Sequence, residues 1–156
     1  MANPSNPSTA SMVTAINAYL HLLRERPDDE SVRLAKLCEA LDCLVVEYHR
    51  APDVEPDTED LAPSVPYEPL AARASASFPE LGRYAHADPM KGLKQELCQG
   101  DAIDDLTDIA RDLSGVLWQI EHGAINDAIW EFRFGYRTHW GIHLHQLRLY
   151  LHSIMH

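Results

Sequence analysis

The sequence predicts an all-α protein, an antiparallel helical bundle of about five helices with a long C-terminal helix. Apolar residues recur every three or four positions over most of the chain. No stretch alternates apolar and polar residues as a half-buried strand would. At 156 residues, the chain suffices for one substantial core. We therefore expect one helical domain over residues 8–156, after a disordered N-terminus at residues 1–7 that is rich in Pro, Asn and Ser.

Two apolar stripes mark helices in the N-terminal third. The first stripe consists of Met12, Ile16, Leu20 and Leu23. Pro27 then interrupts the pattern, and the two aspartates that follow it are suited to capping a helix. The second stripe consists of Leu34, Leu37, Cys38, Leu41, Leu44, Val45 and Tyr48. These features predict an antiparallel helical hairpin.

The middle of the chain is dominated by helix-breaking residues. Residues 51–69 carry five prolines and six acids, so we expect a Pro-rich acidic loop at 51–66. A short helix is predicted from about residue 69 to 77, followed by a turn at "FPELGRY". In residues 85–100, Pro89 is suited to begin a brief helix that Gly100 would end.

Two long amphipathic helices are predicted after residue 100. The first runs from Asp101 to about residue 122, and Gly123 is a natural C-terminal stop. The second runs from about residue 125 almost to the end, and its roughly 30 residues would span about 45 Å. Trp130 and Phe134 lie beside its main apolar stripe, which predicts burial from two directions and favours a homodimer.

The charge of the chain restricts its partners. The formal net charge is −11 at pH 7, so the average surface field repels nucleic acid and anionic membranes and favours a basic protein partner.

No stretch reaches the roughly 18 apolar residues that a membrane helix requires. The three cysteines have no zinc-ribbon spacing, and their odd number argues against a closed disulfide framework. These features predict a cytoplasmic protein that binds neither nucleic acid nor membrane.

Five aspartates gather in the segment "DAIDDLTDIARDL", and two interpretations compete. On a helical wheel they lie nearly opposite the apolar stripe, which favours a solvated face. Such a face could bind a basic partner through Asp104, Asp105 and Asp108.

The alternative interpretation is a metal site. Asp105, Asp108 and Asp112, at spacings of three and four, would place carboxylates on adjacent turns. Asp127 and Glu131 on the next helix could complete a cage for Mg²⁺ or Mn²⁺. "DDLTD" followed by "VLW" resembles the acidic helix of all-α nucleoside triphosphate pyrophosphatases. That family pairs glutamates on one helix with Glu-x-x-Asp on the next, whereas this chain has aspartates on the first of these two helices and no Glu-x-x-Asp on the second.

Histidines are concentrated near the C-terminus, at His139, His143, His145, His152 and His156. His139 and His143 are one helical turn apart, so their two imidazoles could reach a single metal ion. No His-Glu-x-x-His or Glu-x-x-His motif accompanies them. The alternative is that they bond to neighbouring carbonyl groups or pack against aromatic rings.

Three motifs occur in a recognisable order: "FPELGRY", "DDLTDIARDL" and "AIWEFRFGYRTHWGIH". They resemble a bacterial family of small helical proteins, domain-of-unknown-function family 5063. The resemblance covers about half of the chain, mostly after Phe78, and Arg83 departs where that family often has an aromatic residue. It implies a cytoplasmic helical domain and supplies no reaction. The residues that match the family's motifs are Asp104, Asp105, Asp108, Asp112, Trp130, Glu131, His139, Trp140, Gly141 and His143.

The sequence supports two hypotheses about function. The leading hypothesis is a non-catalytic protein-interaction module with an acidic surface and no cofactor, because no reaction motif is present. The rival is a divalent-metal-dependent enzyme resembling nucleotide pyrophosphohydrolases. Its predicted metal residues are Asp105, Asp108, Asp112, Glu131 and His139.

Overall fold

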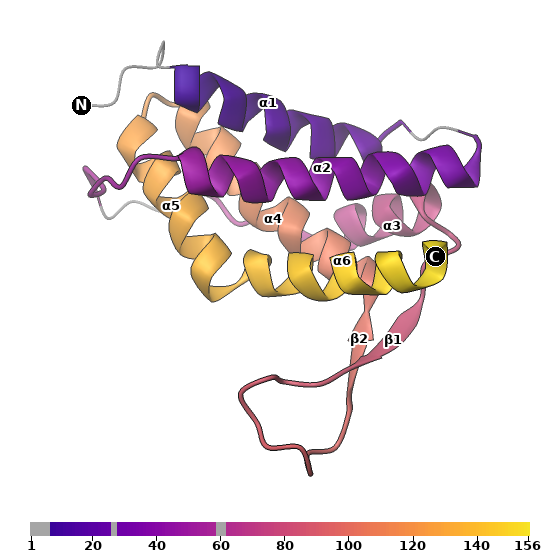
Figure 1. Ribbon diagram of the computed structural model, residues 1–156. Helices are drawn as coiled ribbons and strands as arrows, with labels where there is room; N and C mark the ends of the chain where they lie inside the picture. Colours follow the sequence, from indigo (N-terminus) through magenta and orange to yellow (C-terminus); the bar gives the residue numbers. More distant parts are fainter. Residues whose placement is uncertain (1–6, 26–27, 59–61) are drawn as a thin grey trace.

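The structure, a computed structural model, describes residues 7–25, 28–58 and 62–156 (Figure 1). These residues form six α-helices and one two-stranded antiparallel sheet. The mostly helical class is confirmed, and the predicted bundle of about five helices is roughly consistent with the six helices of the described residues; the small sheet was not predicted. Most of the predicted disordered N-terminus, residues 1–6, lies outside the described residues, and Pro7 already belongs to the first helix. The elements are α1 (Pro7–Leu22), α2 (Glu30–Arg50), α3 (Tyr67–Ser77), β1 (Arg83–His86), β2 (Cys98–Asp101), α4 (Ala102–Glu121), α5 (Ile125–Thr138) and α6 (Trp140–Met155).

Helices α1 and α2 form the predicted hairpin and lie side by side along one side of the molecule (Figure 1). Asp29 caps α2, because its side chain accepts a hydrogen bond of 2.9 Å from the backbone N–H of Val32. This confirms the predicted capping role for an aspartate after Pro27. The apolar residues of both helices, among them Ile16 and Leu37, are buried in the common core.

Helix α4 lies at the centre of the fold and packs against α1, α3, α5 and α6. Its predicted limits are confirmed: Asp101 is the N-cap, and Gly123 follows the helix with a φ of +80°. Leu106 and Leu113 on its apolar stripe are fully buried. The acidic side chains of α4 contact α3, β1 and α6, and the candidate site lies there.

The predicted single C-terminal helix is wrong, because the chain turns at His139 and divides it into α5 and α6. Trp140, just after the turn, is fully buried, with its ring 5.1 Å from that of Phe132. Gly135 makes room for the indole, since a Cβ there would lie 2.7 Å from Trp140 Cδ1. Gly141 is equally restricted, since a Cβ there would collide with the carbonyl oxygen of Tyr136. The turn therefore buries Trp140 in the core.

The second apolar face predicted for this region is only partly covered within the single chain. The ring of Phe134 is stacked on that of Trp130, with 4.7 Å between the centroids. Phe134 is 41% exposed and Trp130 is only partly buried. The homodimer that this face favours stays a prediction.

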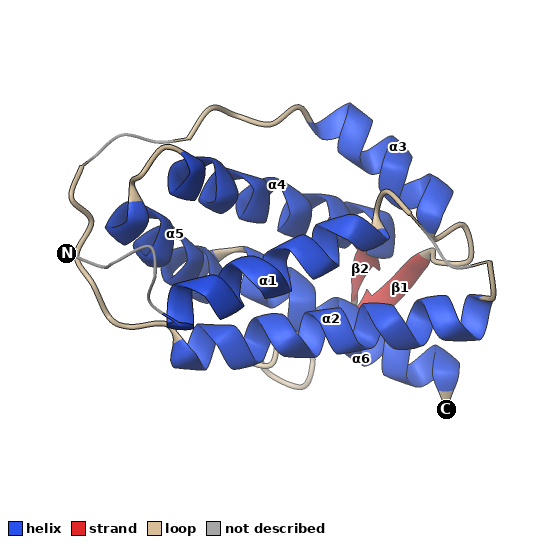
Figure 2. Cartoon of the chain, turned by 90° about the horizontal axis from the view of Figure 1, so that it is seen from above, coloured by secondary structure: helices blue, strands red, loops and turns tan. Residues whose placement is uncertain are grey.

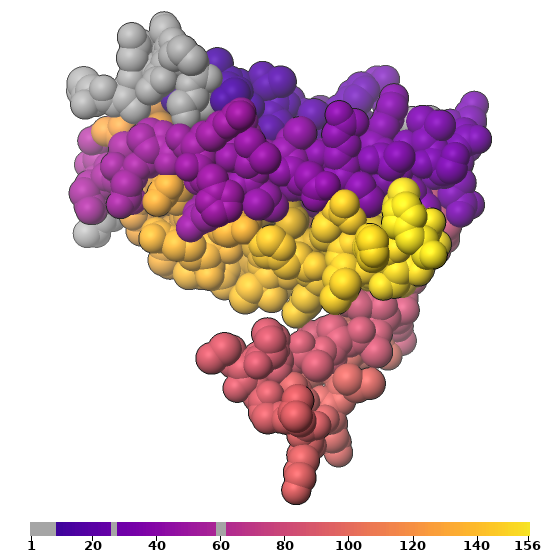
Figure 3. All heavy atoms as spheres, viewed as in Figure 1, coloured from indigo at the N-terminus to yellow at the C-terminus, as the bar shows by residue number. Residues whose placement is uncertain are grey.

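A β-arm, residues 83–101, projects from the helical body (Figures 1 and 3). In its antiparallel register Tyr84 lies opposite Gly100, and the Tyr84 ring fills the space that a side chain at Gly100 would need. Tyr84 also stacks on Tyr150 of α6, with 4.8 Å between ring centroids. The brief helix predicted between Pro89 and Gly100 is absent, because those residues form the arm's loop and its second strand.

The described residues between α2 and α3 form no helix or strand, as their prolines predict. Figure 2 shows this segment passing outside α5 and α4 before it reaches α3. It is anchored to α5, because the backbone N–H and the hydroxyl of Thr58 both donate hydrogen bonds of 2.9 Å to Asp127. None of the described helices is long and apolar enough to cross a membrane.

The close contact at Gly141 can be tested with a matched pair of substitutions. We expect Gly141→Ala to lower the free energy of unfolding by about 1–3 kcal/mol, because the added methyl group meets a backbone carbonyl. Gly115→Ala in α4 is the control, since a Cβ there would meet Ala62 at an ordinary 3.5 Å. Its higher helix propensity should raise that free energy by up to about 1 kcal/mol. If chemical denaturation shows the same increase in the free energy of unfolding for both variants, the contact at Gly141 is not close.

Candidate functional site

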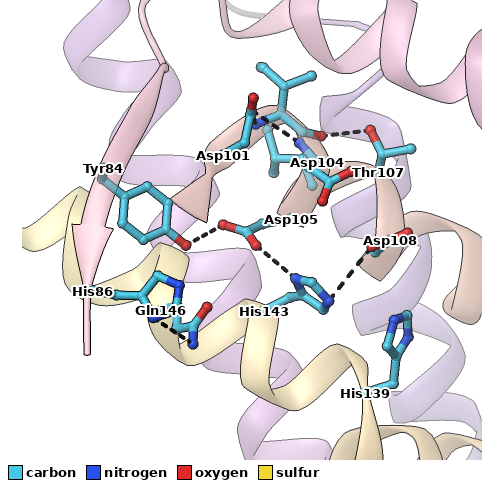
Figure 4. A network of polar contacts seen from close by, with 12 residues as sticks. Tyr84, His86, Asp101, Asp104, Asp105, Thr107, Asp108, His139, His143 and Gln146 are labelled. Atoms are coloured by element: carbon cyan, nitrogen blue, oxygen red, sulfur yellow. Dashed lines mark hydrogen bonds and ion pairs between the residues drawn. The ribbon is translucent and has the colours of Figure 1, made fainter. Parts of the chain in front are cut away.

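A buried aspartate of α4 connects three elements. Asp105 is 3% exposed, and its two carboxylate oxygens accept hydrogen bonds from different elements (Figure 4). One oxygen accepts from the Tyr84 hydroxyl on β1, and the other accepts from His143 Nδ1 on α6 at 2.7 Å. Burial and this hydrogen bond raise the pKa of Tyr84 well above its usual range, so its hydroxyl remains a donor.

His143 is held between two aspartates of α4. Its Nδ1 donates to Asp105, and its Nε2 lies 3.6 Å from Asp108 Oδ2. The hydrogen bond to Asp105 raises the pKa of His143, although partial burial opposes the increase. Because a carboxylate oxygen accepts, Nδ1 must carry the hydrogen, and in the neutral ring Nε2 then carries the lone pair.

His139 repeats this arrangement two turns further along α4. Its Nδ1 lies 2.7 Å from Asp112 Oδ2, and its ring centroid lies 5.0 Å from that of His143. Each imidazole is thus oriented through Nδ1 by its own aspartate. Asp108 lies on α4 between those two aspartates, and Figure 4 shows both rings turned toward it.

Asp108, His139 and His143 form a cluster with the dimensions of a metal site. One donor atom from each of the three lies within 4.8 Å of the others. Imidazoles that bind metal ions in proteins usually donate their other ring N–H to a carboxylate, which fixes the tautomer and the orientation of the ring. Asp105 and Asp112 occupy that position here. This set could therefore hold a divalent ion between α4 and α6.

Asp104 and Asp108 of α4 have further partners. The Tyr67 hydroxyl of α3 donates a 2.6 Å hydrogen bond to Asp104, which raises the pKa of Tyr67 to about 12. Arg111 lies 3.4 Å from Asp108 and donates to the carbonyl oxygen of Val65 at 3.3 Å. The solvated-face interpretation is therefore wrong for Asp105, which is buried, and the side chain of Asp108 is only 15% exposed.

A cleft of about 330 Å³ opens beside His139, between α4, α5 and residues 62–65. Glu131 lines it, and burial, followed by the nearby charge of Asp112, raises the pKa of Glu131. Gln119 lines its other part and is 3% exposed. Its Oε1 has no hydrogen-bond partner among the residues that the structure describes. Of the three cluster residues, His139 lines this cleft.

The structure places the predicted metal residues in three different roles. Asp108 and His139 lie in the three-residue cluster, whereas Asp105 and Asp112 orient the imidazoles. Glu131 lies in the cleft. Asp127, expected to join a carboxylate cage, instead binds Thr58 and is 4% exposed.

Sequence reasoning missed part of the site. Tyr84 and Tyr67 were not identified, because neither belongs to a pattern of ligand residues. His143 was left out of the predicted metal set, although its one-turn spacing from His139 already indicated a shared ion. The spacing of four residues between His139 and His143 is the sequence signal that points to His143.

The fold and site define a class: a helical protein with a short β-arm, in which two histidines and three aspartates meet between two helices. The chain belongs to the family described as "Domain of unknown function (DUF5063)", whose model matches residues 5–156. Its fold is similar to the crystal structure of protein BF1032 from Bacteroides fragilis, with a TM-score of 0.77 and 17% sequence identity. The similarity covers 97% of this chain and 94% of that one. No curated protein matches the sequence.

Removing the buried carboxylate tests the network around Asp105. In metal-free protein we expect Asp105→Ala to lower the free energy of unfolding by about 2–4 kcal/mol, because Tyr84 and His143 lose their shared acceptor. Asp104→Ala is the control, since it removes one hydrogen bond from a partly exposed residue and should cost about 1 kcal/mol or less. If urea denaturation shows that both variants lose the same free energy of unfolding, Asp105 has no special role in stability.

The pKa of His143 predicts a pH dependence of stability. A histidine whose pKa is raised by folding stabilises the native state fully below its unfolded value, near 6.5, and loses that contribution as the pH rises through the folded value. His143→Asn keeps a donor near Asp105 but cannot become charged. In metal-free protein, the stability advantage of the wild type over this variant should therefore shrink from pH 6 to pH 8. An advantage that is constant or grows over this range would contradict the prediction.

Proposed function

We propose that this protein binds a divalent transition-metal ion through Asp108, His139 and His143. The observation that carries the proposal is the double pairing of the histidines. Asp105 accepts from Nδ1 of His143, and Asp112 accepts from Nδ1 of His139, so each neutral ring keeps its Nε2 lone pair. One donor atom of each of the three proposed ligands lies within 4.8 Å of the others.

The donor set supports some ions over others. Two imidazoles and one carboxylate suit Zn²⁺ or Fe²⁺, whereas Mg²⁺ prefers oxygen ligands and retained water molecules. The Mg²⁺ or Mn²⁺ expected from the carboxylates alone is therefore less well supported, because two of those carboxylates already pair with imidazoles. Three protein ligands also leave coordination positions for water or a substrate.

The surroundings of the cluster favour hydrolysis as the class of reaction. The side chain of His139 is 47% exposed, so the proposed ion would be accessible from solvent. An ion of this kind acidifies its bound water and makes it a nucleophile near neutral pH. Glu131, in the adjoining cleft, has the raised pKa that suits a carboxyl group to proton transfer.

The two hypotheses from the sequence receive unequal support. A nucleotide pyrophosphohydrolase would need carboxylates from two helices around its ions. Asp127 lies instead against the loop before α3, and Asp105 and Asp112, which would share the ions with Glu131, pair with imidazoles. A basic protein partner is favoured by the net charge of −11. However, Asp104 pairs with Tyr67, Asp105 is buried and Asp108 faces His143, so these acids support an ion better than a docking surface.

Calorimetric titration of metal-free protein with Zn²⁺, Fe²⁺ under anaerobic conditions, and Mg²⁺ tests the proposal. We expect one transition-metal ion per chain and weaker binding of Mg²⁺. Replacing a ligand, as in His143→Ala, should weaken Zn²⁺ binding at least about 100-fold, and Asp112→Ala should weaken it about 10–100-fold by releasing His139.

The matched control is His152→Ala, which removes an exposed histidine from the last turn of α6. Its Zn²⁺ affinity should equal that of the wild type. If the wild type takes up no Zn²⁺ or Fe²⁺, or if His152→Ala and His143→Ala weaken binding equally, the proposed site is wrong.

A further inference from the structure

The loop of the β-arm presents large apolar side chains to solvent. Met90 is 91% exposed, Leu97 is 71% exposed and Leu93 is fully exposed. Among the described residues, these are the most exposed large apolar side chains. The segment that carries them projects from the helical body (Figures 1 and 3). Apolar residues gathered on a projecting segment mark a contact site, whereas single exposed ones are ordinary.

Hydrogen bonds within the loop hold it in this form. Gln95 Nε2 donates to the carbonyl oxygen of Asp88 at 2.6 Å, and Gln95 Oε1 accepts from the backbone N–H of Asp88 at 3.1 Å. The Asp88 carboxylate accepts from the backbone N–H of Met90 at 2.9 Å. At the base of the arm, Tyr84 donates to Asp105. The loop is therefore pre-organised, which lowers the entropic cost of a contact.

The charge of the loop is opposite to that of the chain. The chain has three lysines, and two of them, Lys91 and Lys94, lie in residues 89–95. This segment contains no acid, although Asp88 and Glu96 flank it, and the whole chain has a net charge of −11. We call residues 89–95 the arm tip. An apolar surface with acidic groups beside it would complement the arm tip.

The chain carries a surface of this kind on α5. The rings of Trp130 and Phe134 are stacked, and Phe134 is exposed. Asn126 lies one helical turn before Trp130 and donates hydrogen bonds of 3.1 and 3.0 Å to Asp57 of the Pro-rich acidic loop. That loop, residues 51–66, contains five acids and no Lys or Arg. The aromatic pair therefore has acidic groups near one end.

We propose that the arm tip of one copy docks on the Trp130–Phe134 pair of a second copy. In Figure 1 the arm tip lies apart from α5, so a contact between them joins two molecules. Met90 brings a sulfur to the aromatic rings, and Lys91 and Lys94 bring cations to the rings and the acidic loop. Two different surfaces meet, so the copies associate head to tail. This inference is independent of the proposed metal site.

A lipid surface fits the arm tip less well than a second copy does. Anionic headgroups attract the two lysines, but they repel the rest of a chain with a net charge of −11. A second copy offers aromatic rings and acids together at one place.

Sedimentation velocity over a concentration series tests the proposal. We expect the wild type to self-associate weakly and reversibly, because the contact is small, and salt should weaken the association. The double variant Met90→Ser, Leu93→Ser should weaken it at least about tenfold, and so should Phe134→Ala. The matched control is Leu149→Ser, which removes an exposed apolar side chain from α6 and should change nothing. The two tip residues are exposed, so their substitution leaves the core intact.

Mixing the variants tests which surfaces meet. The double tip variant keeps its α5 face, and Phe134→Ala keeps its arm tip. At a concentration where each alone is monomeric, their mixture should form a 1:1 heterodimer and no larger species, because one intact tip and one intact face remain. A dimer in which α5 packs against α5 would not form in this mixture.

Three results would overturn the proposal. The first is a wild type that stays monomeric at about 1 mM. The second is a double tip variant that associates as strongly as Leu149→Ser, and the third is a mixture that stays monomeric. Vesicles of phosphatidylglycerol and phosphatidylethanolamine provide the competing assay. If they bind a monomeric wild type but not the double tip variant, the arm tip belongs to a lipid surface and the second copy is wrong.

Discussion

The arrangement of the site depends on one buried carboxylate, that of Asp105. Burying an ionised carboxylate in a protein is unfavourable unless donors replace its hydration. Here the donors are the Tyr84 hydroxyl from the β-arm and Nδ1 of His143 from α6, so three elements must be in place together. The same hydrogen bond that satisfies Asp105 sets the tautomer of His143. Asp105 therefore contributes to the stability of the fold and also leaves Nε2 of His143 available for a ligand.

The turn at His139 supplies the second constraint. Trp140 is fully buried beside Gly135, and this packing directs α6 back along α4. His139, at the turn, and His143, one turn later, consequently both face the aspartates of α4 (Figure 4). Membership of the DUF5063 family agrees with the motifs around these residues, and the similarity to protein BF1032 supports the fold alone.

Local patterns predicted α4 accurately, because its capping residues Asp101 and Gly123 and its apolar stripe all lie within one segment. The turn at His139 was missed because apolar residues keep their helical spacing on both sides of it. The strands were missed because each has only four residues, too few to show an alternating pattern. Burial of Asp105 was not predictable from its position on the helix, since its partners come from 21 residues before it and 38 residues after it.

The central claim is that two aspartates fix both imidazoles with hydrogen on Nδ1 and a lone pair on Nε2. Nitrogen-15 NMR of labelled, metal-free protein above the raised pKa of His143 measures this directly, because protonated and unprotonated ring nitrogens resonate far apart. We expect His139 and His143 to show the Nδ1–H form, and Zn²⁺ to shift their Nε2 resonances. An Nε2–H form at either residue, or Nε2 resonances that Zn²⁺ leaves unchanged, would contradict the account.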